Sequence, residues 1–96
     1  MKPKSVKCPI TKVATLLSDT WTMLIMHFLI EGPKRFCELE KSLDGISTRT
    51  LTLKLSKLLE DGMIAKKDDG SYSATKKGKG LKLIEDSMRQ YEKKYM

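Results

Sequence analysis

The chain has 96 residues, of which 40% are hydrophobic, so we expect one small domain with a modest core, and the composition excludes a disordered chain. Lys and Arg outnumber Asp and Glu by 19 to 12, and the resulting net charge of +7 favours a polyanionic partner such as nucleic acid. The two cysteines are too few for a disulfide framework and lack the spacing of metal ligands, which indicates a reducing compartment.

The first predicted helix begins at Pro9. Residues 1–7 are basic and aperiodic, and we expect them to form a flexible arm in front of a single domain that comprises residues 8–96. Proline is favoured in the first turn of a helix, which makes Cys8 the capping residue. The apolar residues that follow recur at helical spacing and are Ile10, Val13, Ala14 and Leu17.

The second predicted helix is apolar on nearly all of its surface. One stripe is followed by the terminating pair Gly32-Pro33 and consists of Trp21, Leu24, Ile25, Phe28 and Leu29. The opposite side carries Met23, Met26 and Ile30. A helix of this kind is buried on both sides. It therefore lies at the centre of the monomer or has its back against another chain.

Two further helices are predicted on either side of a short turn. The third is marked by Phe36, Leu39 and Leu43 and ends at Asp44-Gly45. The fourth is capped by Ser47, ends at Gly62 and has a stripe that we expect to be buried, made of Leu51, Leu55, Leu58 and Leu59. Two helices joined by so short a turn have the spacing of a helix-turn-helix.

Two short strands, residues 63–67 and 71–75, are predicted after the fourth helix. Asp69-Gly70 between them is a strong hairpin signal. A basic hairpin directly after a helix-turn-helix is typical of a wing. The predicted fold class is therefore mainly α with a small β-hairpin wing, which is a winged helix-turn-helix.

The last predicted helix is capped by Thr75 and has the apolar pattern of an association surface. Its apolar residues are spaced three, four, three and four apart and are Leu81, Ile84, Met88, Tyr91 and Tyr95. The row spans only about two heptads, so it needs other surfaces to associate. Met23 and Met26 on the back of the second helix are candidates for this role. We therefore expect a homodimer.

The order of these elements and several local strings resemble the HxlR-type winged helix-turn-helix regulators. The resemblance covers the chain from Cys8 to about Tyr91, and no single string is decisive, but their joint order and spacing are specific. The strings that carry it are Cys8-Pro9-Ile10, Trp21-Thr22, residues 31–36, Glu38-Leu39, residues 45–51, Leu55, Leu58, residues 59–64, Tyr72-Ser73-Ala74-Thr75, Gly78 and Leu81.

This resemblance implies a dimer built by the N- and C-terminal helices, which presents two recognition helices to successive major grooves. It also implies a repressor or an activator of transcription, and some members sense electrophiles or oxidants through a cysteine placed like Cys8. Two features depart from the family. The hairpin loop, residues 68–71, is shorter than the usual wing, which leaves a minor-groove contact open, and Ser18-Asp19-Thr20 replaces a glycine and a lysine.

The fourth helix is the candidate recognition helix. With its leucine stripe turned inward, helical geometry places the candidates for DNA contact on the outer side, namely Arg49, Thr50, Leu53, Ser56 and Lys57. Arginine binds guanine through two hydrogen bonds, and hydroxyls and lysines bind bases or phosphates. Ser47 and Thr48 at the helix start are candidates for holding a phosphate, although capping equally explains Ser47. An ordinary solvated face is the alternative.

Other basic residues are candidates for contact with the DNA backbone. Lys76 and Lys77 crowd the start of the last helix, where positive charge opposes the helix dipole and a phosphate would compensate the cost. A frayed, solvated terminus is the alternative. The remaining candidates are Lys66 and Lys67 on the hairpin and Lys34 and Arg35 before the third helix.

Three other side chains have chemistry of interest. Cys8 at a helix cap has a thiolate favoured by the dipole and by neighbouring lysines, so it is a candidate redox sensor, with an inert cysteine as the alternative. Cys37 lies beside the apolar face of the third helix, and we expect it to pack. His27 has no partner motif and is interpreted as an interface or core residue.

The sequence does not indicate an enzyme. It has one His, no glycine-rich phosphate loop and no recognisable Ser, His and Asp set, and it predicts no cofactor and no metal site. The predicted function is a sequence-specific regulator of transcription that binds double-stranded DNA. The alternatives are a winged-helix protein-interaction module and a sequence-tolerant architectural DNA-binding protein. The longest apolar run, residues 23–30, is too short to span a bilayer, so we expect a cytoplasmic protein without a membrane partner.

Overall fold

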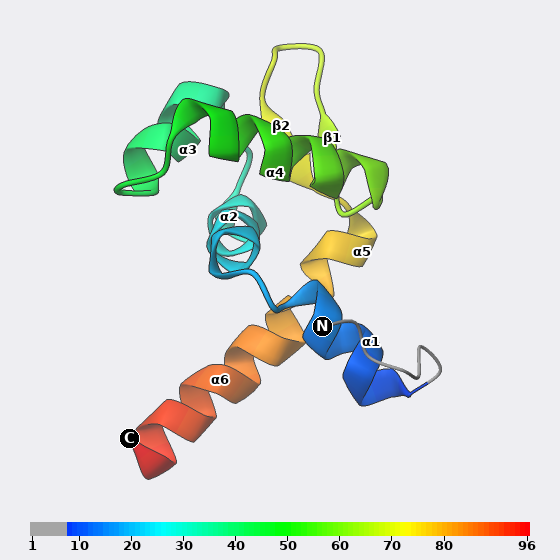
Figure 1. Cartoon of the computed structure of the whole chain (residues 1–96), viewed down its shortest axis with the longest axis vertical. Helices are drawn as coiled ribbons and strands as arrows, with labels where there is room; N and C mark the ends of the chain where they lie inside the picture. Colours follow the sequence, from blue (N-terminus) through cyan, green and yellow to red (C-terminus); the bar gives the residue numbers. More distant parts are fainter. Residues whose placement is uncertain (1–7) are drawn as a thin grey trace.

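A computed structural model describes residues 8–96 and shows a mainly helical chain with one hairpin (Figure 1). The expected N-terminal arm, residues 1–7, lies outside the described residues. The elements in chain order are α1 (Pro9–Leu16), α2 (Thr20–Glu31), α3 (Phe36–Ser42), α4 (Thr48–Glu60), β1 (Ile64–Lys66), β2 (Tyr72–Ala74), α5 (Lys76–Lys79) and α6 (Lys82–Tyr95).

The first helix begins where the sequence predicts, and the second begins directly before its apolar stripe. Cys8 adopts the extended backbone of a capping residue and Pro9 occupies the first turn of α1. The side chain of Asp19 accepts a hydrogen bond from the backbone N–H of Trp21 at 3.0 Å and so caps α2. No residue of α1 is buried, whereas α2 lies at the centre of the fold.

The helix-turn-helix is formed by α3, a tight turn and α4. Gly45 has a φ of +87°, a left-handed conformation that glycine adopts without strain. The backbone N–H of Ile46 then returns to the carbonyl of Leu43 at 3.1 Å. Ser47 Oγ accepts a hydrogen bond from the backbone N–H of Thr50 at 3.1 Å, which caps α4 as predicted.

The predicted wing is an antiparallel pair of strands in which Ile64 faces Ala74 and Lys66 faces Tyr72. Each strand is one residue shorter at either end than predicted, although backbone hydrogen bonds from Lys67 to Ser71 and from Thr75 to Met63 continue the pairing beyond the strands. A third segment extends the sheet. The backbone N–H of Lys34 donates to the carbonyl of Tyr72 at 3.0 Å, and the N–H of Tyr72 donates to the carbonyl of Lys34 at 2.8 Å.

The last helix is not continuous, contrary to the prediction. Thr75 caps the four-residue helix α5, and the chain bends at Gly80 before α6 begins. Within α5, Gly78 closely approaches the backbone after α4. A Cβ atom at this position would lie 2.1 Å from the carbonyl oxygen of Met63, so only glycine fits. The bend directs α6 away from the rest of the domain (Figure 1).

The core contains two residues that the sequence placed in the dimer interface. Met26 and Leu81 are only 0% and 5% exposed and pack among the leucines of α2, α3 and α4. Their assignment to a dimer interface is therefore wrong. Leu24 and Leu59, which we expected to be buried, are exposed instead. A helix that is apolar all round does not reveal from its sequence which side faces its own core.

No single helix among residues 8–96 combines the length and apolar composition needed to cross a membrane. Together, α1 and α2 meet those criteria, as a pair bent by 85°. In this fold α2 buries Ile25, Met26 and Leu29 within the domain.

Candidate DNA-binding surface

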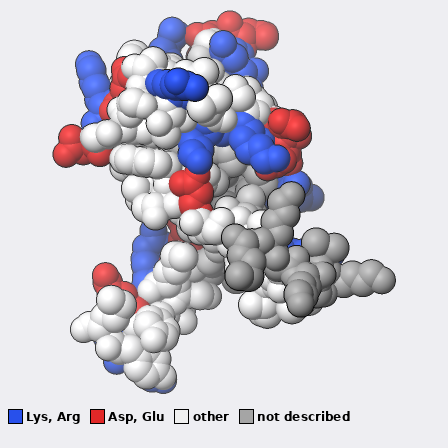
Figure 2. All heavy atoms as spheres, in the orientation of Figure 1, with Lys and Arg blue, Asp and Glu red and all other residues white. Residues whose placement is uncertain are grey.

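The outer face of α4 has the orientation that the sequence predicts. Leu51, Leu55 and Leu58 are buried, and Arg49, Leu53 and Ser56 are exposed on the other side. Leu53 is 58% exposed, which is high for a leucine within a helix. Lys and Arg side chains are spread over the part of the molecule that contains α3, α4 and the hairpin (Figure 2). The structure therefore presents α4 with its polar face outward.

The hydroxyl groups at the start of α4 are engaged within the protein. Ser47 Oγ donates to Thr50 Oγ1 at 2.9 Å, and Thr48 Oγ1 donates to Glu40 Oε2 at 2.5 Å. In this arrangement both hydroxyl hydrogens are used within the protein, so a phosphate at the start of α4 would compete with Thr50 and Glu40 for them. Sequence reasoning missed Glu40, which precedes Thr48 by eight residues, because the contact crosses between two helices.

Two lysines of α4 pair with carboxylates. Lys57 Nζ lies 3.5 Å from Asp61 Oδ1, and Lys54 Nζ contacts Asp19 Oδ2. Burial opposes the charge of Asp19, but hydrogen bonds from Lys54 and from the backbone N–H of Trp21 outweigh it and lower the pKa of this carboxyl. The Lys54 pair ties α4 to the beginning of α2. Sequence reasoning did not find it, because its partners are far apart along the chain.

The hairpin carries charges of both signs. Lys66 and Lys67 are exposed, and the Lys66 ammonium lies 5.6 Å from the centre of the Tyr72 ring. At the turn, Asp69 accepts hydrogen bonds from the hydroxyl of Ser71 at 2.6 Å and from its backbone N–H at 2.9 Å, which lower the pKa of Asp69. The hydrogen bonds to the Asp69 carboxylate therefore hold the loop of the hairpin together. Lys66 and Lys67 precede this loop in the chain.

The lysines at α5 differ in their contacts. Lys77 Nζ donates to the backbone carbonyl of Asp61 at 2.8 Å, so a carbonyl at the end of α4 already compensates part of its charge. Lys76 is exposed. In front of α3, Arg35 is exposed and Lys34 is half-buried by its pairing with the hairpin. Of these four residues, Lys76 and Arg35 are exposed and have no contact with the protein among those described above.

The two cysteines have different surroundings. The polar groups at the start of α1, first the backbone N–H and side chain of Thr11 and then the backbone N–H of Ile10, lower the pKa of the partly exposed Cys8. Cys37 is exposed, so the prediction that it packs is wrong. The short helix α3 turns Phe36 and Leu39 toward the core and leaves Cys37 between them on the outside. Within residues 8–96 no cluster of His, Cys, Asp and Glu could hold a metal ion.

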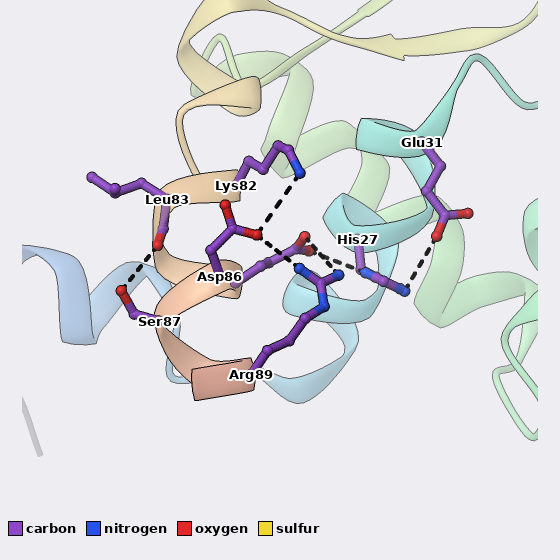
Figure 3. A network of polar contacts seen from close by, with 8 residues as sticks. His27, Glu31, Lys82, Leu83, Asp86, Ser87 and Arg89 are labelled. Atoms are coloured by element: carbon purple, nitrogen blue, oxygen red, sulfur yellow. Dashed lines mark hydrogen bonds and ion pairs between the residues drawn. The ribbon is translucent and has the colours of Figure 1, made fainter. Parts of the chain in front are cut away.

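A polar network joins α2 to α6 (Figure 3). His27 Nδ1 lies 3.2 Å from Glu85 Oε1, and His27 Nε2 lies 3.6 Å from Glu31 Oε1. Arg89 continues the network, with Nη2 3.8 Å from Glu85 Oε2 and Nη1 3.0 Å from Asp86 Oδ1. This network ties α2 to the beginning of α6, the helix that carries the predicted dimer row. Of that row, Ile84 packs partly against the core, whereas Met88, Tyr91 and Tyr95 are exposed.

A capped helix-turn-helix, a hairpin behind it and an outward polar face on the second helix define a winged helix-turn-helix protein that binds DNA. The family model described as HxlR-like helix-turn-helix matches residues 16–96. The chain therefore belongs to the HxlR-like helix-turn-helix family, and it is a DNA-binding regulator of transcription.

Known proteins resemble the chain over most of its length. It is 31% identical over 94 residues to YdeP of Bacillus subtilis, an uncharacterised helix-turn-helix transcriptional regulator. The aligned region covers 92% of this chain and 73% of YdeP. The structure is similar to that of quinone-bound YodB from Bacillus subtilis, with a TM-score of 0.84, 29% identity and coverage of 92% and 99% of the two chains. It also resembles the redox regulator HypR in its reduced form, with a TM-score of 0.80, 26% identity and coverage of 91% and 92%.

Proposed function

We propose that the protein acts as a homodimer that recognises an inverted-repeat operator in double-stranded DNA. The observation that carries the proposal is the exposed row of Met88, Tyr91 and Tyr95 on α6. The helix extends away from the domain, and its outer end is largely uncharged on the face seen in Figure 2. An apolar row of this spacing is typical of a helix that packs against another helix.

A second exposed apolar surface lies on α1. Ile10 is 77% exposed and Val13 is also exposed, although a helix of this pattern normally buries that face. Packing of both surfaces against a second copy would remove apolar area from water. Each Å² of apolar surface buried in this way contributes about 25 cal/mol of favourable free energy. Met23 is half-buried beside α6 and remains a candidate for the same interface, together with Ile84.

Within such a dimer, two α4 helices would enter the major groove. Arg49, Leu53 and Ser56 are our candidates for base contact, because their side chains leave the outer face of α4. Thr50 and Lys57 flank this face, and Ser47 and Thr48 would offer acceptor oxygens or backbone groups at its start. The candidates for phosphate contact are Lys34, Arg35, Lys66, Lys67, Lys76 and Lys77.

The operator is tested by selecting bound fragments from random DNA. Recovery of an inverted repeat supports a symmetric, sequence-specific regulator. Binding without sequence preference would instead indicate an architectural protein, and the absence of DNA binding would favour a protein-interaction module.

The dimer is tested by sedimentation of Tyr91→Ser beside Lys93→Ser, which lies on the opposite side of α6. Only Tyr91→Ser should increase the monomer fraction. Equal sedimentation of the two variants would place the interface elsewhere.

We further propose that Cys8 senses oxidants or electrophiles. Its lowered pKa increases the thiolate fraction, which is the reactive form of the thiol. The similar structures named above include quinone-bound YodB and the redox regulator HypR, which favours this role. A Cys8→Ser variant should bind DNA with the affinity of the reduced protein and lose any response to diamide or quinone.

We also infer that the protein is not an enzyme and acts in the cytoplasm, where the DNA is. Its one imidazole, His27, lies between the carboxylates of Glu31 and Glu85, where it links two helices. Members of its family are regulators of transcription. We propose no cofactor for the regulator.

A further inference from the structure

A hollow of about 480 Å³ lies between α1, the start of α2 and the recognition helix α4. Its volume is in the range of pockets that hold small molecules. Among its walls are Lys12 and Leu16 from α1 and Leu53 and Lys57 from α4. It is therefore open to solvent and in direct contact with the outer face of α4.

The walls combine an apolar floor with an excess of positive charge. Leu16, Leu53 and Leu58 supply the apolar part. Three lysines and two aspartates also line the hollow, but the aspartates are engaged: Asp19 contacts Lys54 and Asp61 lies 3.5 Å from Lys57.

Lys12 differs from the other two lysines. Within residues 8–96, no carboxylate oxygen lies within 4.0 Å of its ammonium nitrogen. This leaves Lys12 available for an anionic group that enters the hollow.

We propose that this hollow binds a small organic anion, a carboxylate with an apolar body of about the size of a benzene ring. The apolar body would cover Leu16 and Leu53 and so remove them from water. The carboxylate would pair with Lys12 and compete with Asp61 for Lys57. A cation would be repelled by the excess of lysines over aspartates, and a neutral molecule would leave Lys12 without an ion-pair partner.

The location of the hollow gives the ligand a regulatory effect, and this part of the inference rests on the proposed function. Leu53 and Lys57 belong to the proposed DNA-contact face, so an anion bound there would occupy side chains that DNA requires. Binding of the anion and of DNA would then oppose each other. Linkage requires that each weakens the affinity of the other by the same factor.

The hollow between α2 and α6 is a weaker candidate for a ligand. It is lined by Met23, His27 and Met88, among others, and lies on the proposed dimer surface. A second copy of the chain is therefore its expected occupant.

The anion site is tested directly with isotope-labelled full-length protein and sodium benzoate, at constant ionic strength and in the absence of DNA. Amide NMR signals of Lys12, Leu16, Leu53 and Lys57 should shift with benzoate at concentrations up to about 10 mM. Benzamide, which has the same shape without the charge, should shift them far less. Equal effects of benzoate and benzamide, or shifts confined to α6, would overturn the proposal.

The role of Lys12 is tested by substitution. Lys12→Gln should lower the affinity for benzoate by about two- to fivefold, which is the range for an exposed ion pair, and Lys12→Arg should restore most of it. Lys41→Gln removes an exposed lysine outside the hollow and should leave benzoate binding unchanged. Equal losses in the Lys12 and Lys41 variants would contradict a specific site.

The regulatory step is tested with the selected operator. Benzoate should weaken DNA binding of the wild type and have less effect on Lys12→Gln, whose DNA affinity without benzoate should match the wild type. If benzoate fills the hollow and DNA affinity does not change, the regulatory role is wrong. If the wild type binds no DNA at all while benzoate still binds in the hollow, the proposed function fails and the anion site stands.

Discussion

The imidazole of His27 in α2 and the carboxylate of Glu85 in α6 lie 3.2 Å apart, although 58 residues separate them in sequence. Glu85 is 8% exposed, and its second oxygen lies 3.8 Å from Arg89. A buried carboxylate is costly unless it is paired. This contact therefore joins α2 to the first turn of α6, the helix that carries the proposed dimer row.

Replacing Glu85 should destabilise the fold through this contact. Glu85→Ala leaves His27 without its partner in α6, and we expect a loss of about 1 to 3 kcal/mol, the range for a buried polar group that loses its hydrogen-bond partner. Urea unfolding measures the loss. Glu92→Ala, at an exposed position two turns further along the same side of α6, is the matched control for helix propensity. If both variants lose the same stability, the contact does not hold α6 in place.

The local signals in the sequence predicted most of the fold. Local effects explain three of these signals: Pro9 has a fixed φ that suits a first helical turn, Ser47 caps a helix, and Gly45 adopts a left-handed conformation. Each acts within one turn of the chain, so its effect does not depend on distant residues. The break between α5 and α6 was not predictable in this way. The same holds for the close approach of Gly78 to the Met63 carbonyl, a contact that only the packed fold creates.

The candidate site was predictable in its outline and not in its pairings. The leucine stripe of α4 determined which side chains face outward, and Leu53 is exposed as a result. The partners of Thr48, Lys54 and Lys77 all lie outside α4 or α5, on other segments of the chain. Of these three residues, Thr48 and Lys77 were candidates for DNA contact, so their contacts within the protein change how free they are to bind DNA.

The pair between Asp19 and Lys54 should make stability depend on pH. The pKa of the Asp19 carboxyl is lower in the folded protein than in the unfolded chain. The charge of Asp19 therefore stabilises the fold fully at pH values above the ordinary carboxyl pKa of about 3.9, and this stabilisation is lost as the pH falls through the lower pKa of the folded state. Asparagine also caps helices well. Asp19→Asn should therefore be less stable than the wild type at neutral pH, and the difference should vanish in acid. A difference that is constant with pH would exclude the charge as its source.

Arg49 and Lys76 should affect DNA binding in different ways. Arg49→Ala removes a proposed base contact and should cost about 1 to 3 kcal/mol on the operator, with relaxed preference at one base pair in each half-site. Lys76→Ala removes a proposed phosphate contact and should weaken binding to all sequences, with a salt slope reduced by about one. Binding measured at several salt concentrations, on operator and random DNA, separates the two. A sequence-selective loss in Lys76→Ala would contradict its assignment.

Lys77→Ala is expected to behave differently from Lys76→Ala. Lys77 also donates to the Asp61 carbonyl, so its removal should lower the stability of the fold as well as DNA affinity. Thermal unfolding of the two variants without DNA measures this difference. Equal melting temperatures would show that the Asp61 contact contributes nothing in solution.

The two thiols should react with different pH profiles. Cys37 is exposed, but the pKa of Cys8 is lowered, so the alkylation rate of Cys8 should level off at a lower pH than that of Cys37. Mass mapping of iodoacetamide adducts over a series of pH values measures both rates in one sample. Profiles with the same midpoint would remove the physical basis for sensing by Cys8.

Leu53 should contribute to sequence preference through an apolar contact. It is 58% exposed on the outer face of α4, where an apolar side chain gains by covering the 5-methyl group of a thymine. Leu53→Gln should weaken operator binding and reduce the preference for thymine at one position in each half-site. Replacing that thymine by uracil removes only the methyl group, so it should weaken the wild type and leave Leu53→Gln nearly unchanged. Since Leu53 also lines the hollow beside α1, benzoate should reduce the effect of the methyl group in the wild type. An equal response of both proteins to uracil would show that Leu53 does not contact the methyl group.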